Sequence, residues 1–161
     1  MTDHTDTLDH APTLDRTDPV SHTGGDAVAR LRLVLRANAT FSFVCGAVAL
    51  VTGSWLSREL DIDHVTVTRL LGGGLILFAV AVLVISRLDA PLLRTESLVV
   101  SIADITWVLG SVAILLTGLL NETGNIVLAL VGLVVADFGA MQLFYRAKAT
   151  AGSRELRTAT V

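Results

Sequence analysis

Two aspartates stand inside long apolar stretches of this 161-residue chain, and they are its most informative chemical groups. Asp104 lies within residues 99–120, and Asp137 lies in a later run of similar apolarity. Near the centre of a membrane helix an aspartate costs about 2.5–3.5 kcal/mol on insertion scales. Three interpretations are open: hydrogen bonds that fasten helices together, a proton or cation relay in which the two carboxylates share a proton, and a contact with a partner protein or a lipid headgroup.

The spacing from nearby arginines predicts that both carboxylates lie at a similar depth. Asp104 follows Arg94 by ten residues, which is about 15 Å of helix, and Asp137 precedes Arg146 by nine residues, which is about 14 Å. A tight turn at residues 121–124 joins the two helices, so they are expected to be antiparallel neighbours. We therefore expect both carboxylates in the inner leaflet.

Three further residues complete the candidate polar site within the membrane. Arg36 and Asn38, on the first apolar helix, are the expected partners of the carboxylates. Trp107 lies one turn beyond Asp104, and its indole N–H is expected to reach that carboxylate or a backbone carbonyl. In the first interpretation, Asp104 and Asp137 are neutral or paired with Arg36 or Asn38.

Small and hydroxyl side chains recur at helical spacing along the same stretches. Such residues let membrane helices approach closely and form hydrogen bonds to one another. The predicted helix-packing residues are Ser42, Ser101, Ser111, Gly132, Ala136 and Gly139. The triplet at residues 72–74 is glycine throughout and is expected to admit a close neighbour in the same way.

The elements that position these residues are four apolar helices. Hydrophobic residues make up 52% of the chain, and the mean hydropathy is +0.67 although the first thirty residues are almost wholly polar. The predicted helices cover residues 37–56, 69–86, 97–120 and 125–145, each long enough to cross a bilayer. The fold class is therefore all-α, a membrane-spanning four-helix bundle with up-down-up-down topology.

The flanking segments are expected to differ from this bundle. Residues 1–26 form an acidic tail without apolar periodicity, which predicts disorder and does not match a signal peptide. Gly24, Gly25 and Asp26 read as a helix breaker and cap, and Pro91 is placed in the turn before the third helix. The transmembrane domain is assigned to residues 27–147, and a basic tail at residues 148–161 is expected to fray.

Basic residues near the helix ends predict the orientation in the membrane. One side collects nine of them and the other side two. The first set is Arg30, Arg32, Arg36, Arg87, Arg94, Arg146, Lys148, Arg154 and Arg157, and the second is Arg58 and Arg69. This asymmetry predicts that both termini are cytoplasmic.

No catalytic constellation, cofactor motif or strong metal site is recognisable in the sequence. The single cysteine, Cys45, excludes an internal disulfide and a paired-cysteine redox centre. The histidines His4, His10, His22 and His64 lie beside aspartates in polar segments, where weak metal binding is a minor alternative. A net charge of −3 gives no indication of nucleic-acid binding.

Two stretches resemble a known group of proteins. Residues 35–39, with Ser42 and Gly46, resemble the first helix of small four-helix bacterial membrane proteins, and residues 103–111 resemble their third helix. In size and layout the chain is similar to the broad DoxX-like group over residues 30–147. The resemblance implies a four-helix bundle in the bacterial inner membrane. Some members of that group are membrane subunits associated with oxidoreductases, and no catalytic residue carries over.

Together these features predict an integral membrane protein that is not an enzyme. We expect an accessory or scaffold subunit that acts through a protein partner or through self-association. The first alternative is a small transporter or proton-conducting subunit that uses Asp104 and Asp137. The second is a membrane anchor subunit of an oxidoreductase.

Overall fold

The computed structural model describes residues 20–60 and 65–159, and these fold into α-helices without any strand. Four of the described helices are long and apolar enough to cross a membrane, which confirms the all-α, multi-pass prediction. The helices are α1 (Val20–Val51), α2 (Gly53–Glu59), α3 (Val65–Ile85), α4 (Ala90–Thr117) and α5 (Glu122–Ala159).

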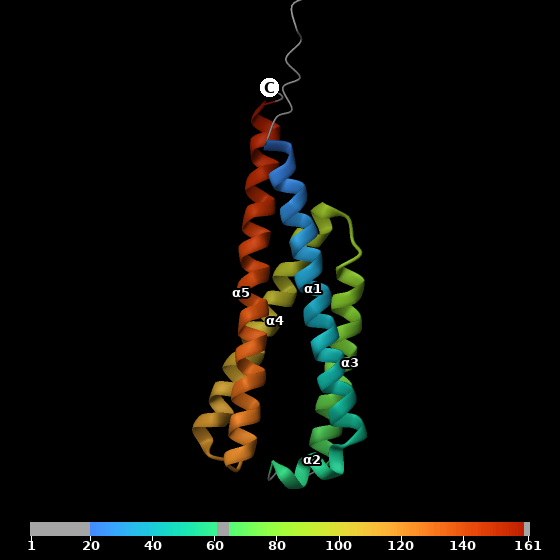
Figure 1. Cartoon of the computed structure of the whole chain (residues 1–161), viewed down its shortest axis with the longest axis vertical. Helices are drawn as coiled ribbons and strands as arrows, with labels where there is room; N and C mark the ends of the chain where they lie inside the picture. The colour runs from blue at the N-terminus through green and yellow to red at the C-terminus, as the bar shows by residue number, and fades with distance from the viewer. Residues whose placement is uncertain (1–19, 61–64, 160–161) are drawn as a thin grey trace, which may run out of the picture.

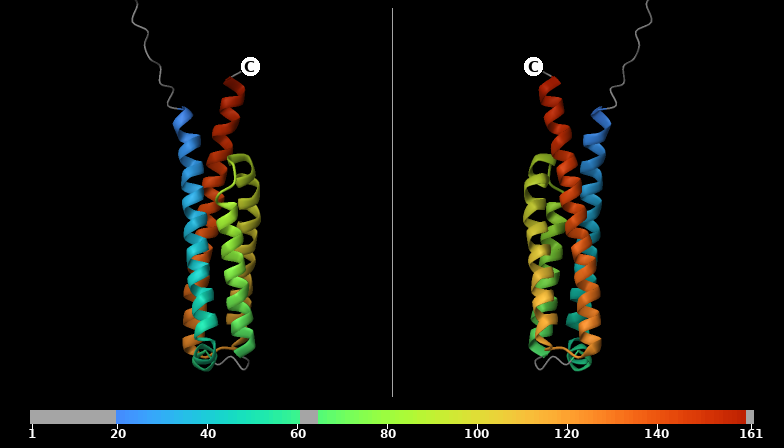
Figure 2. Two further views of the ribbon diagram at one scale, coloured as in Figure 1. Left: turned by 90° about the vertical axis from the view of Figure 1, so that its right-hand side faces the viewer. Right: turned by 90° about the vertical axis from the view of Figure 1, so that its left-hand side faces the viewer.

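The four long helices run lengthwise beside one another, and short α2 lies across one end (Figure 1). Helix α1 packs between α3 and α5, while α4 packs mainly against α5. The described start of α1 and end of α5 lie at the same end, and both helices extend beyond the turn that joins α3 to α4 (Figure 2). Buried apolar side chains near this end form the core, namely Leu31, Leu35, Ala39, Val82, Leu93 and Val100.

Two glycines set the close approach of α1 and α3. A Cβ atom added to Gly46 would lie 2.6 Å from the carbonyl oxygen of Gly72, and one added to Gly72 would lie 2.8 Å from the carbonyl oxygen of Gly46. Since real Cβ atoms do not come so close to backbone atoms, only glycine permits this contact. The close approach predicted for the glycine triplet is therefore found at Gly72, whereas Gly73 and Gly74 have open space around them.

Three of the predicted helix boundaries are wrong. Helix α1 runs through Gly24, Gly25 and Asp26 without a break, and its continuation buries Ala27. Helix α5 continues through the predicted basic tail to Ala159, and Ala149 within this continuation is fully buried. The first predicted helix divides at Thr52, after which α2 carries the exposed Trp55.

The third predicted helix also begins earlier than expected. Pro91 lies in the first turn of α4, where the missing N–H is not needed for a helical hydrogen bond, rather than in the preceding turn. At its other end α4 stops at Gly118, whose φ of 66° is the left-handed conformation that glycine adopts readily. Asn121 then caps α5, since its Oδ1 accepts a hydrogen bond from the backbone N–H of Gly124 at 2.8 Å.

Candidate functional site: a buried carboxylate that joins three helices

Asp104 lies at the centre of a hydrogen-bond network that connects three helices. Its Oδ2 accepts a bond from Nδ2 of Asn38 on α1 at 2.8 Å and another from Nε2 of Gln142 on α5 at 2.9 Å. Asp104 itself is on α4 and only 3% exposed, and both amides are fully buried. The carboxylate is therefore held by one donor from each of the two helices packed around it.

Two serines extend the network at its ends. The hydroxyl of Ser42 donates to Oδ1 of Asn38 at 3.4 Å, and the hydroxyl of Ser101 lies 3.1 Å from Oε1 of Gln142. Ser101 is also 2.9 Å from the carbonyl oxygen of Ser97, so its single hydrogen is shared between two acceptors. In both amides the oxygen accepts while the nitrogen donates to Asp104, which orients these side chains.

Gln142 is not among the site residues predicted from the sequence. It lies three residues after Gly139 and continues the stripe of α5 that contains Gly132 and Gly139, so its position on the buried face was readable from the spacing. What the sequence did not reveal is that this stripe faces Asp104 rather than another helix. At Gly139 the two helices are close enough that an added Cβ atom would lie 3.6 Å from the Cβ of Asp104, an ordinary van der Waals contact.

The predicted packing residues lie mostly at helix contacts. Gly132 faces Ser111, and Gly139 faces Asp104, so α4 and α5 run antiparallel with matched seven-residue spacing. Ser42, Ser101 and Ser111 are buried at 4%, 0% and 5% exposure. Ala136 is the exception, because it is exposed and lines an open groove between α4 and α5.

The structure does not bring Asp137 together with Asp104. Asp137 is exposed on the outside of α5, and the residues of that helix that meet Asp104 are Gly139 and Gln142. Two residues along a helix correspond to a rotation of about 200°, so Asp137 points away from the network although it lies close to the same depth. The placement gives no support to a proton shared between the two carboxylates.

Arg36 and Trp107 also differ from their expected places. Arg36 is exposed on α1, and the partner that the carboxylate finds on that helix is Asn38. The Nε1 atom of Trp107 is buried without a hydrogen-bond partner, so the predicted bond to Asp104 or to a carbonyl is wrong. The two donors that Asp104 Oδ2 receives come instead from Asn38 and Gln142 on other helices.

The metal-binding alternatives have no suitable cluster of ligands in the part of the chain that the structure describes. Among those residues, no three histidine, cysteine, aspartate or glutamate side chains cluster in a way that could hold a metal ion. His4, His10 and His64 lie outside the described residues, and so does the side chain of His22. Cys45 is half-buried on α1 with a free thiol.

Comparison with known proteins finds no matching family model, no curated relative and no solved structure. The resemblance to the DoxX-like group therefore stays a prediction that rests on residues 35–46 and 103–111.

Proposed function

We propose that the protein is a membrane scaffold or accessory subunit that acts by association with a second copy of itself within the bilayer. The observation that carries the proposal is the exposed carboxylate of Asp137, which lies within the apolar span Glu122–Ala151. Ionisable residues within membrane helices almost always face a protein interior, a water-filled cavity or a partner, because exposure to lipid is costly.

Asp137 is far from both ends of its span. It follows Glu122 by fifteen residues, which is about 22 Å, and precedes Arg146 by nine residues, which is about 14 Å. Leu133, Met141 and other apolar side chains on the same side of α5 are exposed as well. This side of α5 thus combines one carboxylate with an apolar surround, which is the composition of a helix contact inside a membrane.

The chain itself offers a complementary group. Arg36 is exposed on α1, two residues before Asn38, and Asp137 is exposed on α5, two residues before Gly139. Asn38 and Gly139 both lie against Asp104 and so mark the same level on two antiparallel helices. The two exposed charges are therefore offset by only about 6 Å along the helix axis, within reach of an arginine side chain. A two-fold symmetric contact then forms the pair twice: Arg36 of one copy meets Asp137 of the other, and Asp137 of the first meets Arg36 of the second.

Sidedness and topology are part of the same proposal. The excess of arginine at the end where α1 begins and α5 ends favours a cytoplasmic location for both termini, with the helices in up-down-up-down order. Location in the bacterial inner membrane follows only from the DoxX-like resemblance. Asp104 is assigned the structural task of joining α1, α4 and α5.

The proposal is tested by co-purification of two differently tagged copies, coexpressed and extracted in a mild detergent. The wild-type copies are expected to purify together, whereas Arg36→Gln or Asp137→Asn in both copies reduces the recovered partner several-fold. One Arg36→Gln copy with one Asp137→Asn copy retains a single intact pair and should recover part of it.

A matched control removes another exposed polar group from a membrane span. Thr106 on α4 is exposed, and its hydroxyl is already bonded to the carbonyl oxygen of Ile102 at 2.8 Å. Thr106→Val should leave co-purification unchanged. Recovery of a different protein at a fixed ratio, without a second copy, would contradict self-association and favour an accessory subunit, including the oxidoreductase anchor.

A further inference from the structure

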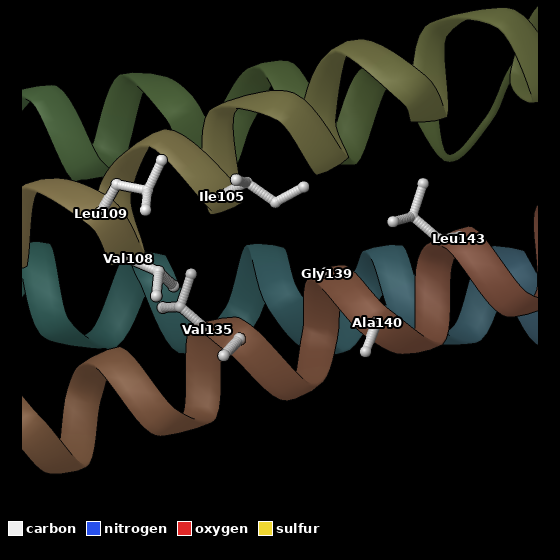
Figure 3. Close-up of a pocket in the computed structure, with 8 residues that line it drawn as sticks. Ile105, Val108, Leu109, Val135, Gly139, Ala140 and Leu143 are labelled. Atoms are coloured by element: carbon white, nitrogen blue, oxygen red, sulfur yellow. The ribbon is translucent and has the colours of Figure 1, made fainter.

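An open apolar groove of about 240 Å³ runs along the outer surface between α4 and α5. On α4 it is lined by Ile105, Val108 and Leu109, and on α5 the lining includes Val135, Ala140 and Leu143 (Figure 3). The α5 side of the groove is open because Ala136 and Ala140 have small side chains and Gly139 has none. Both walls belong to membrane spans, so the groove opens toward lipid.

Two arginines stand beyond one end of this groove. Leu143 at the end of the lining is followed by Arg146 after three residues, about 5 Å of helix. Arg94 precedes Ile105 by eleven residues, about three full turns, so it projects from the groove side of α4. Glu96, two residues later, lies on the opposite side of that helix.

The two side chains are held next to each other. Nε of Arg146 donates to the carbonyl oxygen of Arg94 at 2.8 Å, which fixes its guanidinium against α4. Nε of Arg94 is buried and has no hydrogen-bond partner, although a guanidinium is always charged and a buried donor without an acceptor is costly. Within the described part of the chain, Nε of Arg94 therefore lacks an acceptor, close to the Arg146 end of the α4–α5 groove.

We propose that Arg94 and Arg146 bind the phosphate of a membrane phospholipid, with one acyl chain of that lipid in the groove between α4 and α5. Guanidinium groups match phosphate oxygens in both geometry and charge. Basic pockets between membrane helices are a known way to hold anionic headgroups. The apolar lining begins about one turn from Arg146, which leaves room for the glycerol between phosphate and chain.

The test uses the full chain, stripped of lipid in a mild detergent and titrated with phosphatidylglycerol, with binding followed by native mass spectrometry. The wild-type protein is expected to bind one lipid more tightly than the rest. Arg94→Gln and Arg146→Gln should each weaken this binding about fivefold, on the scale of one basic residue at a membrane surface. Arg94→Lys and Arg146→Lys keep the charge and should lose less.

Two variants separate the parts of the proposal. Arg87→Gln removes an exposed arginine from the α3–α4 turn at the same end and should leave the tight lipid in place. Ala140→Phe fills the groove without removing a charge and should weaken the lipid as Arg94→Gln does. Equal losses for Arg87→Gln and Arg94→Gln, or full binding by Ala140→Phe, would overturn the site.

Inorganic phosphate distinguishes a lipid from a free anion. We expect phosphatidylglycerol to raise the thermal unfolding midpoint and inorganic phosphate at the same concentration to leave it unchanged. An equal rise with phosphate alone would contradict the acyl-chain part of the proposal.

Discussion

Replacing Asp104 by alanine should loosen the contact among α1, α4 and α5, whereas replacing it by asparagine should not. Alanine leaves Nδ2 of Asn38 and Nε2 of Gln142 without their shared acceptor, in positions that water does not reach. Asparagine keeps a carbonyl oxygen where Oδ2 of the aspartate lies, so both amides retain an acceptor.

The size of the effect follows from the number of bonds lost. Hydrogen bonds inside membrane bundles contribute about 0.6 kcal/mol on average and up to about 1.7 kcal/mol. Two such bonds predict that Asp104→Ala lowers the free energy of unfolding by about 1–3 kcal/mol. For Asp104→Asn the expected loss of unfolding free energy is under about 1 kcal/mol, because the asparagine carbonyl oxygen still accepts both amide hydrogen bonds.

The measurement is reversible unfolding in mixed micelles, at concentrations where the protein is a monomer. Asp137→Ala is the matched control, since it removes the same side chain from an exposed position and should change stability by no more than about 0.5 kcal/mol. The reasoning is refuted if Asp104→Ala unfolds like the wild type, or if Asp104→Asn is as unstable as Asp104→Ala.

Three other predictions concern the helix contacts and turns. Gly72→Ala should destabilise the protein by about 1–3 kcal/mol, because the new Cβ meets the backbone of α1. Gly73→Ala is the control, since it has open space around it and should be neutral or stabilising. Thermal unfolding of the two variants measures the difference. Gly118→Ala should cost about 1 kcal/mol in the same assay, owing to its positive φ. Asn121→Ala removes the cap of α5 and a 2.7 Å bond to the carbonyl oxygen of Glu59, so hydrogen exchange should increase in the first turn of α5, with a loss of about 0.5–2 kcal/mol.

The four apolar stretches were readable from the sequence because hydropathy and length alone define a membrane span. Helix ends were harder to predict. Pro91 fits a first turn as well as it fits a loop, and the polar continuation of α5 is helical and buries Ala149. Burial of a residue in a polar segment depends on contacts with distant segments, which no local sequence pattern indicates.

The candidate site also combines features that the sequence predicts with features that only the packing determines. Asp104 and Asn38 stood out because polar groups are rare in apolar runs, and the structure brings them together. The direction of Asp137 depends on the rotation of α5 about its own axis, which places Gly132 and Gly139 against α4. A sequence gives the depth of both aspartates from the helical rise, but their directions follow from this packing.

The most direct test of the different tasks assigned to Asp104 and Asp137 is self-association of labelled full chains in liposomes, followed by energy transfer as lipid is added to dilute them. Asp104→Asn should associate like the wild type, whereas Asp137→Asn should dissociate at a several-fold higher protein-to-lipid ratio while keeping its stability as a monomer. Wild-type association by Asp137→Asn, or a wild-type protein that remains monomeric at every ratio, would contradict the role proposed for the exposed carboxylate.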